Sequence, residues 1–240
     1  MFSFIDVETI PAQDREPFLR AAAEKFSAPS TLTKEKAADE LGLLETKNLS
    51  KDKVIELWTE RFRDSKSLQA GDTAWRNTAL DATYGRLVSI AFKIDENETR
   101  GICNPVDERK LLIEAFVEIE KLLEDRKPYW IGHNVTFDLK FLFRRAVILE
   151  VMPPFELPFK GRHGHDYFCT MQAWCDYREM ISQAKLLEAL NIEPDFDPID
   201  GSQVCDAWLQ GRTTDILNHN MSDVNNCAKA FRRLQFFTES

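Results

Sequence analysis

The sequence has few glycines and prolines, nine and ten in 240 residues, and it contains no internal repeat or low-complexity stretch. Hydrophobic residues make up 43% of the chain. This combination excludes collagen-like, disordered and repeat proteins, and it predicts a chain that folds around a full hydrophobic core. The length fits one large domain or two small ones, and we expect one.

Long apolar runs are also missing. No segment approaches the about 20 apolar residues that a membrane helix needs. The chain enters a strand-like segment directly after Met1, without the charged region that opens a signal peptide. We therefore expect no membrane association and a cytoplasmic location.

Cysteines are scarce, and basic residues are outnumbered. The five cysteines are an odd number, widely spaced and without a CxxC pair, which argues against a disulfide framework and against a zinc site. The chain has 31 Lys and Arg against 40 Asp and Glu, a formal charge of −9. This is the wrong sign for holding nucleic acid by an overall field, so such a partner would need a local basic strip or bound cations.

The hydrophobic periodicity predicts an α/β protein, a mixed sheet flanked by helices, with a helical insertion after the first strand. We expect a single domain over residues 1–240, with the insertion at about 14–78. Strands are predicted at 2–9, 86–94, 99–103 and 129–132. Helices are predicted at 14–26, 33–44 and 50–63 in the insertion, and then at 106–125, 136–149, 171–180, 183–190, 202–210 and 213–237.

Three short segments carry candidate chemistry. The first strand contains Asp6 and Glu8, which share one face and lie close enough to bind one divalent cation. Taken alone, such carboxylates are usually solvated. The second segment runs from a strand end into a helix, with Asn134 as a candidate N-cap and Asp138 as a first-turn acid. That structural role is compatible with a functional one.

The third segment lies in the last helix, where His219 and Asp223 are one turn apart on the same face. A lone histidine is more often structural than catalytic. The order of the three segments changes this balance, because four acids from distant parts of the chain become candidates for one site.

The three segments resemble the three motifs of the DEDD superfamily of 3'-5' exonucleases, which have a ribonuclease H-like fold. Within that superfamily the chain resembles the predicted exonucleases related to the proofreading domain of B-family DNA polymerases. Further similarity is found at residues 79–86, 141–146, 200–202 and 211–212. The resemblance thus covers most of the chain apart from part of the insertion.

The resemblance implies that Asp6, Glu8, Asp138 and Asp223 hold two Mg²⁺ or Mn²⁺ ions. Hard oxygen ligands suit these cations, and two ions about 3.5–4 Å apart stabilise the attacking and leaving oxygens of a phosphoryl displacement. Water attacks and a nucleoside 5'-monophosphate leaves. Without cations the clustered carboxylates repel one another, so some of their pKa values should be raised and metal should stabilise the fold.

Two positions depart from the family pattern. His219 stands at the spacing that normally carries Tyr, and it acts either as general base or by orienting the attacking water; we favour the base. Cys169 stands where many relatives have Asp, and we interpret it as a buried, inert thiol.

The resemblance also implies substrate contacts. Thr9 and Ile10 would meet the 3'-terminal nucleotide, and Asn134 and Phe137 would lie near its base or sugar; a structural role is an equal alternative for each. Candidate phosphate contacts are the cations near the second and third motifs: Lys140, Arg144, Arg145, Lys160, Arg162 and Arg212.

The expected function is a metal-dependent 3'-5' exonuclease acting on single-stranded DNA or frayed 3' ends. One alternative is a 3'-5' exoribonuclease, because no motif reveals contacts to the 2'-OH. An alternative of another class is a catalytically silent nucleic-acid-binding or scaffold subunit. The insertion could cover the substrate, mediate dimerisation or dock a replication or repair partner, and the oligomeric state is open.

Overall fold

The structure, a computed structural model, describes residues 1–43, 45, 47–158, 160–176 and 178–238. The chain forms two compact units, one of Met1–Pro11 and Ala79–Ser240 and the other of Ala12–Thr78. The second unit corresponds to the helical insertion expected at about 14–78. The assignment of residues 1–240 to a single exonuclease domain stays a prediction.

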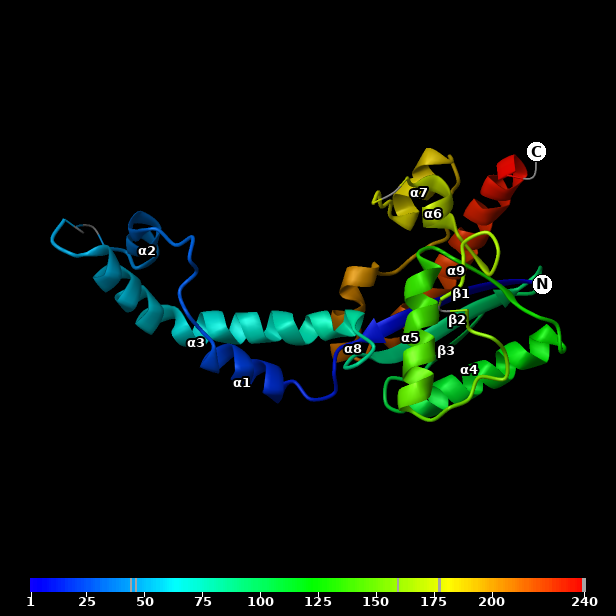
Figure 1. Cartoon of the computed structure of the whole chain (residues 1–240), viewed down its shortest axis with the longest axis horizontal. Helices are drawn as coiled ribbons and strands as arrows, with labels where there is room; N and C mark the ends of the chain where they lie inside the picture. Colours follow the sequence, from blue (N-terminus) through cyan, green and yellow to red (C-terminus); the bar gives the residue numbers. More distant parts are fainter. Residues whose placement is uncertain (44, 46, 159, 177, 239–240) are drawn as a thin grey trace. The chain divides into compact units, whose positions relative to one another are not determined.

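A five-stranded mixed sheet forms the centre of the first unit (Figure 1). Its strand order is β3-β2-β1-β4-β5, with β1 antiparallel to β2 and parallel to β4. This order confirms the predicted ribonuclease H-like sheet. The strands are β1 (Phe2–Ile10), β2 (Arg86–Ile94), β3 (Arg100–Cys103), β4 (Tyr129–Gly132) and β5 (Tyr167–Cys169). Strand β5 was not predicted, because three residues are too few for an alternating pattern to be recognised.

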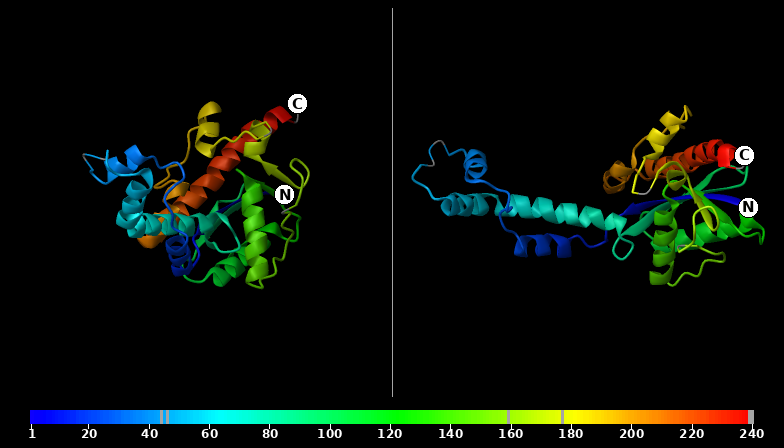
Figure 2. Two further views of the ribbon diagram at one scale, coloured as in Figure 1. Left: turned by 60° about the vertical axis from the view of Figure 1, so that its left-hand side comes forward. Right: turned by 45° about the horizontal axis from the view of Figure 1, so that its top comes forward.

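Helices cover both faces of this sheet. Helices α4 (Glu108–Leu123) and α5 (Val135–Ile148) lie on one side, and α9 (Thr213–Thr238) lies on the other (Figure 2). Along β1, Ile5 and Val7 belong to the core under α4 and α5, whereas Phe4 packs with residues of α9. Because successive strand residues alternate, Asp6 and Glu8 share the Phe4 face and point toward α9.

Short helices complete the first unit. They are η1 (Thr78–Leu80) at its boundary, α6 (Thr170–Trp174), α7 (Gln183–Ala189), η2 (Gly201–Gln203) and α8 (Val204–Leu209). The predicted helix at 171–180 is wrong beyond Trp174, because the backbone is extended at Cys175 and left-handed at Arg178. Tyr177, inside that predicted range, lies outside the described residues. Among the described residues, no helix combines the length and apolar composition that crossing a membrane requires.

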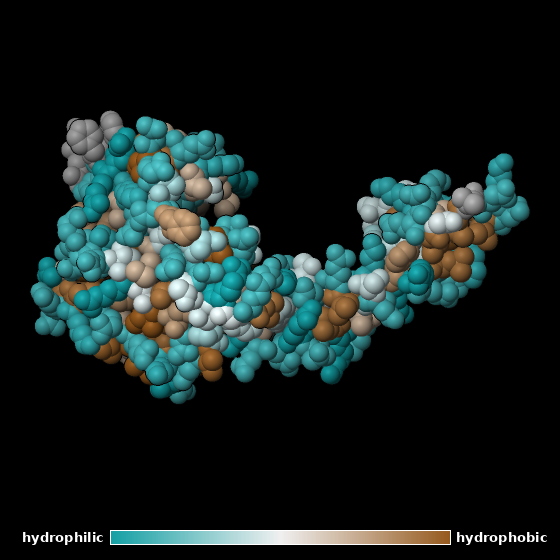
Figure 3. All heavy atoms as spheres, turned by 180° about the vertical axis from the view of Figure 1, so that it is seen from behind, coloured by the Kyte–Doolittle hydropathy of each residue, from teal (hydrophilic) through white to brown (hydrophobic). Residues whose placement is uncertain are grey.

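The insertion unit consists of α1 (Glu16–Glu24), α2 (Lys34–Glu40) and α3 (Lys51–Asn77). Ser50 caps α3 as predicted, accepting a hydrogen bond from the backbone N–H of Lys53. Helix α3 continues to Asn77, beyond its predicted end at Arg63. Helix α2 ends at Glu40, and its predicted last residue, Leu44, lies outside the described residues. Trp58 and Val54 are buried in the small core of this unit, and Figure 3 shows apolar side chains on its surface.

Candidate active site

The carboxyl end of β1 supplies the first two acids. Pairing with β2 shifts by one residue here: Glu8 lies opposite Ser89 and Thr9 opposite Leu87, which leaves Val88 as an extra residue. Such a bulge bends the strand and redirects side chains, and bulges are frequent beside active sites. It follows directly after the Asp6 and Glu8 pair, at the edge of the site.

Asp6 is held by a short hydrogen-bond chain. The Ser89 hydroxyl donates to Asn220 Oδ1 over 2.8 Å, and Asn220 Nδ2 donates to Asp6 Oδ2 over 2.6 Å. Burial raises the pKa of Asp6 well above its ordinary value, and Asp138, Asp223 and Glu8 raise it further; the Asn220 bond opposes this only in part. Asp6 thus occupies a position where a carboxylate is unfavourable unless a cation compensates it.

The second motif brings Asp138 to the same place. Asn134 begins α5 in the left-handed conformation, with φ 63°, and turns the chain from β4 into the helix. In the first turn Asp138 is only 4% exposed, and its Oδ1 accepts a hydrogen bond from the Val7 backbone N–H over 3.2 Å. Burial raises the pKa of Asp138 to about 8, aided by the charges of Glu8 and Asp223 and opposed by the Val7 bond.

The third motif places His219 between carboxylates. Its Nε2 lies 3.2 Å from Glu8 Oε1 and 3.8 Å from Asp223 Oδ2, and its Nδ1 lies 2.7 Å from Asp197 Oδ2. Burial alone would lower the pKa of His219, but these carboxylates, Glu8 above all, raise it to about 10. In the metal-free site the imidazole is therefore charged and supplies the positive charge that the acids lack.

Asp223 completes the set of four acids. Burial raises the pKa of Asp223 to about 7; Glu8 and Asp197 act in the same direction, while the charge of His219 opposes them. One ligand atom each of Glu8, His219 and Asp223 lies within 4.8 Å of the others. The carboxylates of Asp6 and Asp138 interact electrostatically with this group.

These acids form a site of the kind that binds hard divalent cations. Carboxylate oxygens are the ligands that Mg²⁺ and Mn²⁺ prefer, and burial, aided by the charges of neighbouring carboxylates, raises the pKa values of Asp6, Asp138 and Asp223. The donor set therefore fits the expected cations. The structure brings together every residue that the sequence proposed as catalytic or metal-binding.

A comparison with protein-family models gives a match over residues 48–223, more than half of the chain, to a 3'-5' exonuclease model of the kind found in DNA polymerases. The chain belongs to this 3'-5' exonuclease family. The match includes Asp138, His219 and Asp223, whereas Asp6 and Glu8 precede it. The curated proteins gave no match. Exonuclease domains of this family use divalent metals, in agreement with the donor set described above.

The four residues predicted to contact the substrate differ in how far they are buried. Thr9 is half-buried beside Glu8, whereas Ile10 is 1% exposed and packs in a core cluster with Val88 and Ile216. The predicted contact of the Ile10 side chain with substrate is therefore wrong: the side chain is enclosed by apolar neighbours. Asn134 is half-buried at the start of α5, and Phe137 packs against Phe141, with ring centroids 5.5 Å apart.

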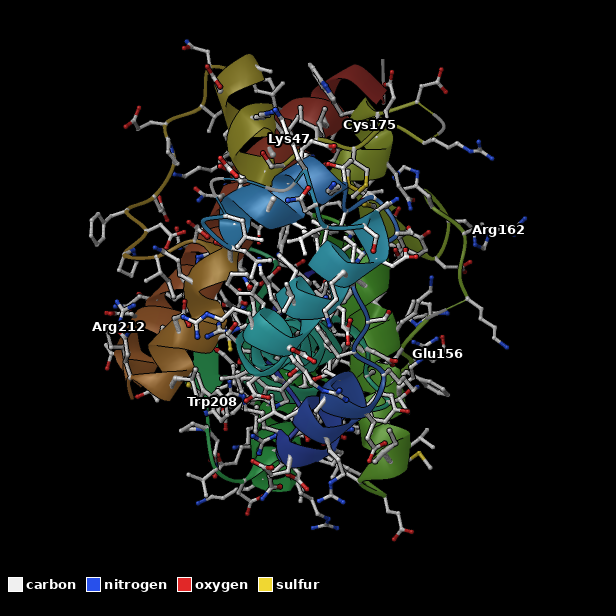
Figure 4. All side chains as sticks on the ribbon, turned by 90° about the vertical axis from the view of Figure 1, so that its left-hand side faces the viewer. Lys47, Glu156, Arg162, Cys175, Trp208 and Arg212 are labelled. Carbon is white, nitrogen blue, oxygen red and sulfur yellow. The ribbon has the colours of Figure 1, made fainter. Side chains whose placement is uncertain are left out.

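One of the predicted phosphate contacts is also wrong. Arg145 is 6% exposed, and its guanidinium binds both oxygens of Glu108, over 2.8 and 2.7 Å. This buried, bidentate pair joins α5 to α4 and has no surface to offer a phosphate. Arg162 and Arg212 are exposed and extend toward opposite sides of the view in Figure 4, the latter paired with Asp215.

Cys169 ends β5 and directly precedes α6. Its side chain is fully buried, and backbone N–H groups of α5 and α6, including those of Val135 and Met171, point at the sulfur. Burial raises the pKa of the thiol, so it stays protonated. The Cys169 side chain therefore brings no charge to the start of α6.

Sequence reasoning missed two residues of the site, Asn220 and Asp197. Asn220 follows His219 directly, yet nothing in its neighbourhood distinguishes it from a polar helix residue. Asp197 lies in a Pro- and Asp-rich segment that reads as a solvated loop. Only the folded chain shows that it contacts His219.

Proposed function

We propose that this protein is a metal-dependent 3'-5' exonuclease. It removes nucleotides from the 3' end of single-stranded DNA, or from frayed ends, and releases nucleoside 5'-monophosphates. The observation that carries the proposal is the meeting of four acids from three distant segments, Asp6, Glu8, Asp138 and Asp223, in a chain of the exonuclease family.

These four acids would hold two Mg²⁺ or Mn²⁺ ions, which when bound supply the positive charge that stabilises a phosphoryl displacement. The bound ions would also explain how a chain with a net charge of −9 binds a polyanion, because the scissile phosphate would contact cations and not the acidic side chains themselves. The protein's own contribution is to hold the acids in place and to oppose in part the rise of their pKa values, through Asn220 on Asp6 and the Val7 N–H on Asp138.

His219 is proposed as the general base, taking a proton from the attacking water at Nε2, the nitrogen that faces Glu8 and Asp223. The pKa of about 10 belongs to the metal-free site. With cations bound to Glu8 and Asp223, the negative charge that stabilises the imidazolium would be neutralised. The pKa of His219 would then be lower, and the neutral imidazole that a general base requires would be favoured. The alternative is that His219 orients the water without accepting its proton.

The deoxyribose preference of this proposal rests on the resemblance to polymerase proofreading domains. A 3'-5' exoribonuclease is the nearest alternative, because the same acids would hydrolyse either backbone. A silent binding subunit is disfavoured by the presence of all four acids, since loss of any one would suffice to end catalysis.

The test is digestion of 5'-labelled single-stranded DNA and RNA of matched sequence, with Mg²⁺, Mn²⁺ or EDTA. We expect a metal-dependent ladder that shortens from the 3' end, faster on DNA, and absent for Asp6→Asn. Asp39→Asn, an exposed acid of α2, serves as the matched control and should behave like the native protein. Intact DNA and RNA under every metal condition would refute the exonuclease, and faster loss of RNA would refute the DNA preference.

A further inference from the structure

The segment of residues 193–199, which we name the strap, contributes a carboxylate to the site. Asp197 Oδ2 lies 2.7 Å from His219 Nδ1, and Asp197 Oδ1 accepts a hydrogen bond from the Ile199 backbone N–H over 3.2 Å. Ile199 is 6% exposed and packs with Ile10 and Val204. Both oxygens of Asp197 are therefore engaged, and the turn that holds the second one is anchored in the core.

The strap is fastened along α9, the helix that carries His219. Lys229 donates to the Glu193 carbonyl over 2.9 Å and pairs with Asp195 over 2.6 Å. The Asp195 backbone N–H donates to Asn226 Oδ1 over 2.8 Å, and the Ser222 hydroxyl points to the Asp195 carbonyl.

These anchors follow His219 on one face of α9, because residues 219, 222, 226 and 229 are spaced by three or four. Ser222 and Asn226 are each only 4% exposed. A loop bound by buried polar groups of the same helix face keeps its place relative to that face. The position of Asp197 against His219 is thus determined by several contacts and not by one surface ion pair.

We propose that Asp197 is the positioning residue of His219: it accepts the Nδ1–H and so directs Nε2 toward Glu8 and Asp223. This inference rests on the proposed function. The bond fixes which nitrogen faces the reacting water and prevents the ring from turning over, as carboxylates do for histidines in other sites.

The first test is a double-mutant cycle on kcat and KM. Asp197→Asn should lower kcat by about 10- to 100-fold, because a misoriented group loses that much, while KM changes little. His219→Ala should lower kcat by about 10²–10⁴-fold. The double variant should be no slower than His219→Ala, because Asp197 acts through His219. Glu193→Gln, an exposed strap acid, is the charge-matched control and should keep the native kcat.

A loss in the double variant equal to the product of the two single losses would overturn the proposal, since Asp197 would then act independently of His219. A native kcat for Asp197→Asn would overturn it as well. An inactive native protein would instead refute the proposed function, and the positioning role is then decided by a measurement without substrate.

That measurement is NMR of the imidazole N–H groups in the metal-free protein. The His219 Nδ1–H, bonded to a carboxylate, should give a low-field proton signal that exchanges slowly with water. The signal should persist in Glu193→Gln and disappear or move upfield in Asp197→Asn. An unchanged signal in Asp197→Asn would refute the positioning role, whatever the activity of the protein.

Discussion

Burial of Asp138 in the candidate site lowers the stability of the folded protein when no metal is bound. It is 4% exposed, and burial raises its pKa to about 8, so at neutral pH ionisation is unfavourable in the folded state. The hydrogen bond from the Val7 N–H and one from its own backbone N–H oppose this rise in part. A neutral amide of the same shape could keep the bond from the Val7 N–H without the charge.

We therefore expect Asp138→Asn to stabilise the metal-free protein while ending cleavage. A gain of about 1 kcal/mol would raise Tm by about 2–4 °C in a protein of this size. Thermal unfolding in EDTA at neutral pH measures the gain, and the labelled-DNA assay measures the loss. Asp39→Asn is the control for a change in net charge. A lower Tm for Asp138→Asn in EDTA would contradict the argument that the carboxylate is destabilising.

The residues that could be predicted are those whose chemistry depends on spacing along the chain. The pairs Asp6 and Glu8, and His219 and Asp223, are close in sequence, so strand and helix geometry alone place each pair on one face. Asp197 and Asn220 could not be predicted, because their partners are 22 and 214 residues away. Ile10 and Arg145 were misjudged because burial is a property of the packed molecule.

At the scale of elements, hydrogen bonds of His133 connect the end of β4 with the start of α6 and with the segment before α7. His133 follows β4, and its Nδ1 lies 2.9 Å from Thr170 Oγ1 at the start of α6, while its Nε2 lies 2.8 Å from the Ile181 carbonyl before α7. In the neutral tautomer that carries the proton on Nε2, this N–H donates to the Ile181 carbonyl. Burial lowers the pKa of His133 below its ordinary value of 6.5.

This lowered pKa predicts acid sensitivity. In the unfolded chain His133 takes up a proton as the pH falls through about 6.5, whereas the folded protein resists protonation until a lower pH. The unfolded state then binds more protons, so stability is lost as the pH falls below about 6.5. We expect Tm to decline less between pH 7 and pH 5 in His133→Gln than in the native protein. His165→Gln, with a side chain 70% exposed, is the control and should retain the native decline.

The first residues of helices that have a capping side chain were predicted better than the last residues of helices. Ser50 and Thr33 cap α3 and α2 because their side chains accept the free N–H groups of the first turn. The length of α3 was underestimated, since its second half lacks a regular apolar stripe and contains Gly71. That glycine is there for packing: a Cβ at this position would lie 2.8 Å from Leu19 Cα in α1.

Gly71→Ala should therefore destabilise the insertion unit, although alanine favours helices by about 1 kcal/mol over glycine. Overpacking against a neighbouring backbone costs about 1–3 kcal/mol. Thermal unfolding of the full chain would show the loss, with Ser65→Ala, at an exposed position of the same helix, as control. A higher Tm for Gly71→Ala would mean that α1 moves away without cost.

At the scale of the whole molecule, charge is the deciding property. The chain carries a net charge of −9, and three carboxylates with raised pKa values, those of Asp6, Asp138 and Asp223, meet in one place. We expect that divalent cations bound to these acids would remove repulsion that the folded state alone experiences. Metal binding is therefore linked to folding stability.

We expect Mg²⁺ or Mn²⁺ to raise Tm in a saturable way, because a ligand at about 100 times its Kd stabilises the folded state by about 2.7 kcal/mol. NaCl at equal ionic strength controls for screening of the overall charge and should reproduce only a small part of the rise. The rise should be lost in Asp6→Asn and kept in Asp39→Asn. An equal rise with NaCl, or one retained in Asp6→Asn, would show that the cations act on the general acidity of the surface and not on the four acids.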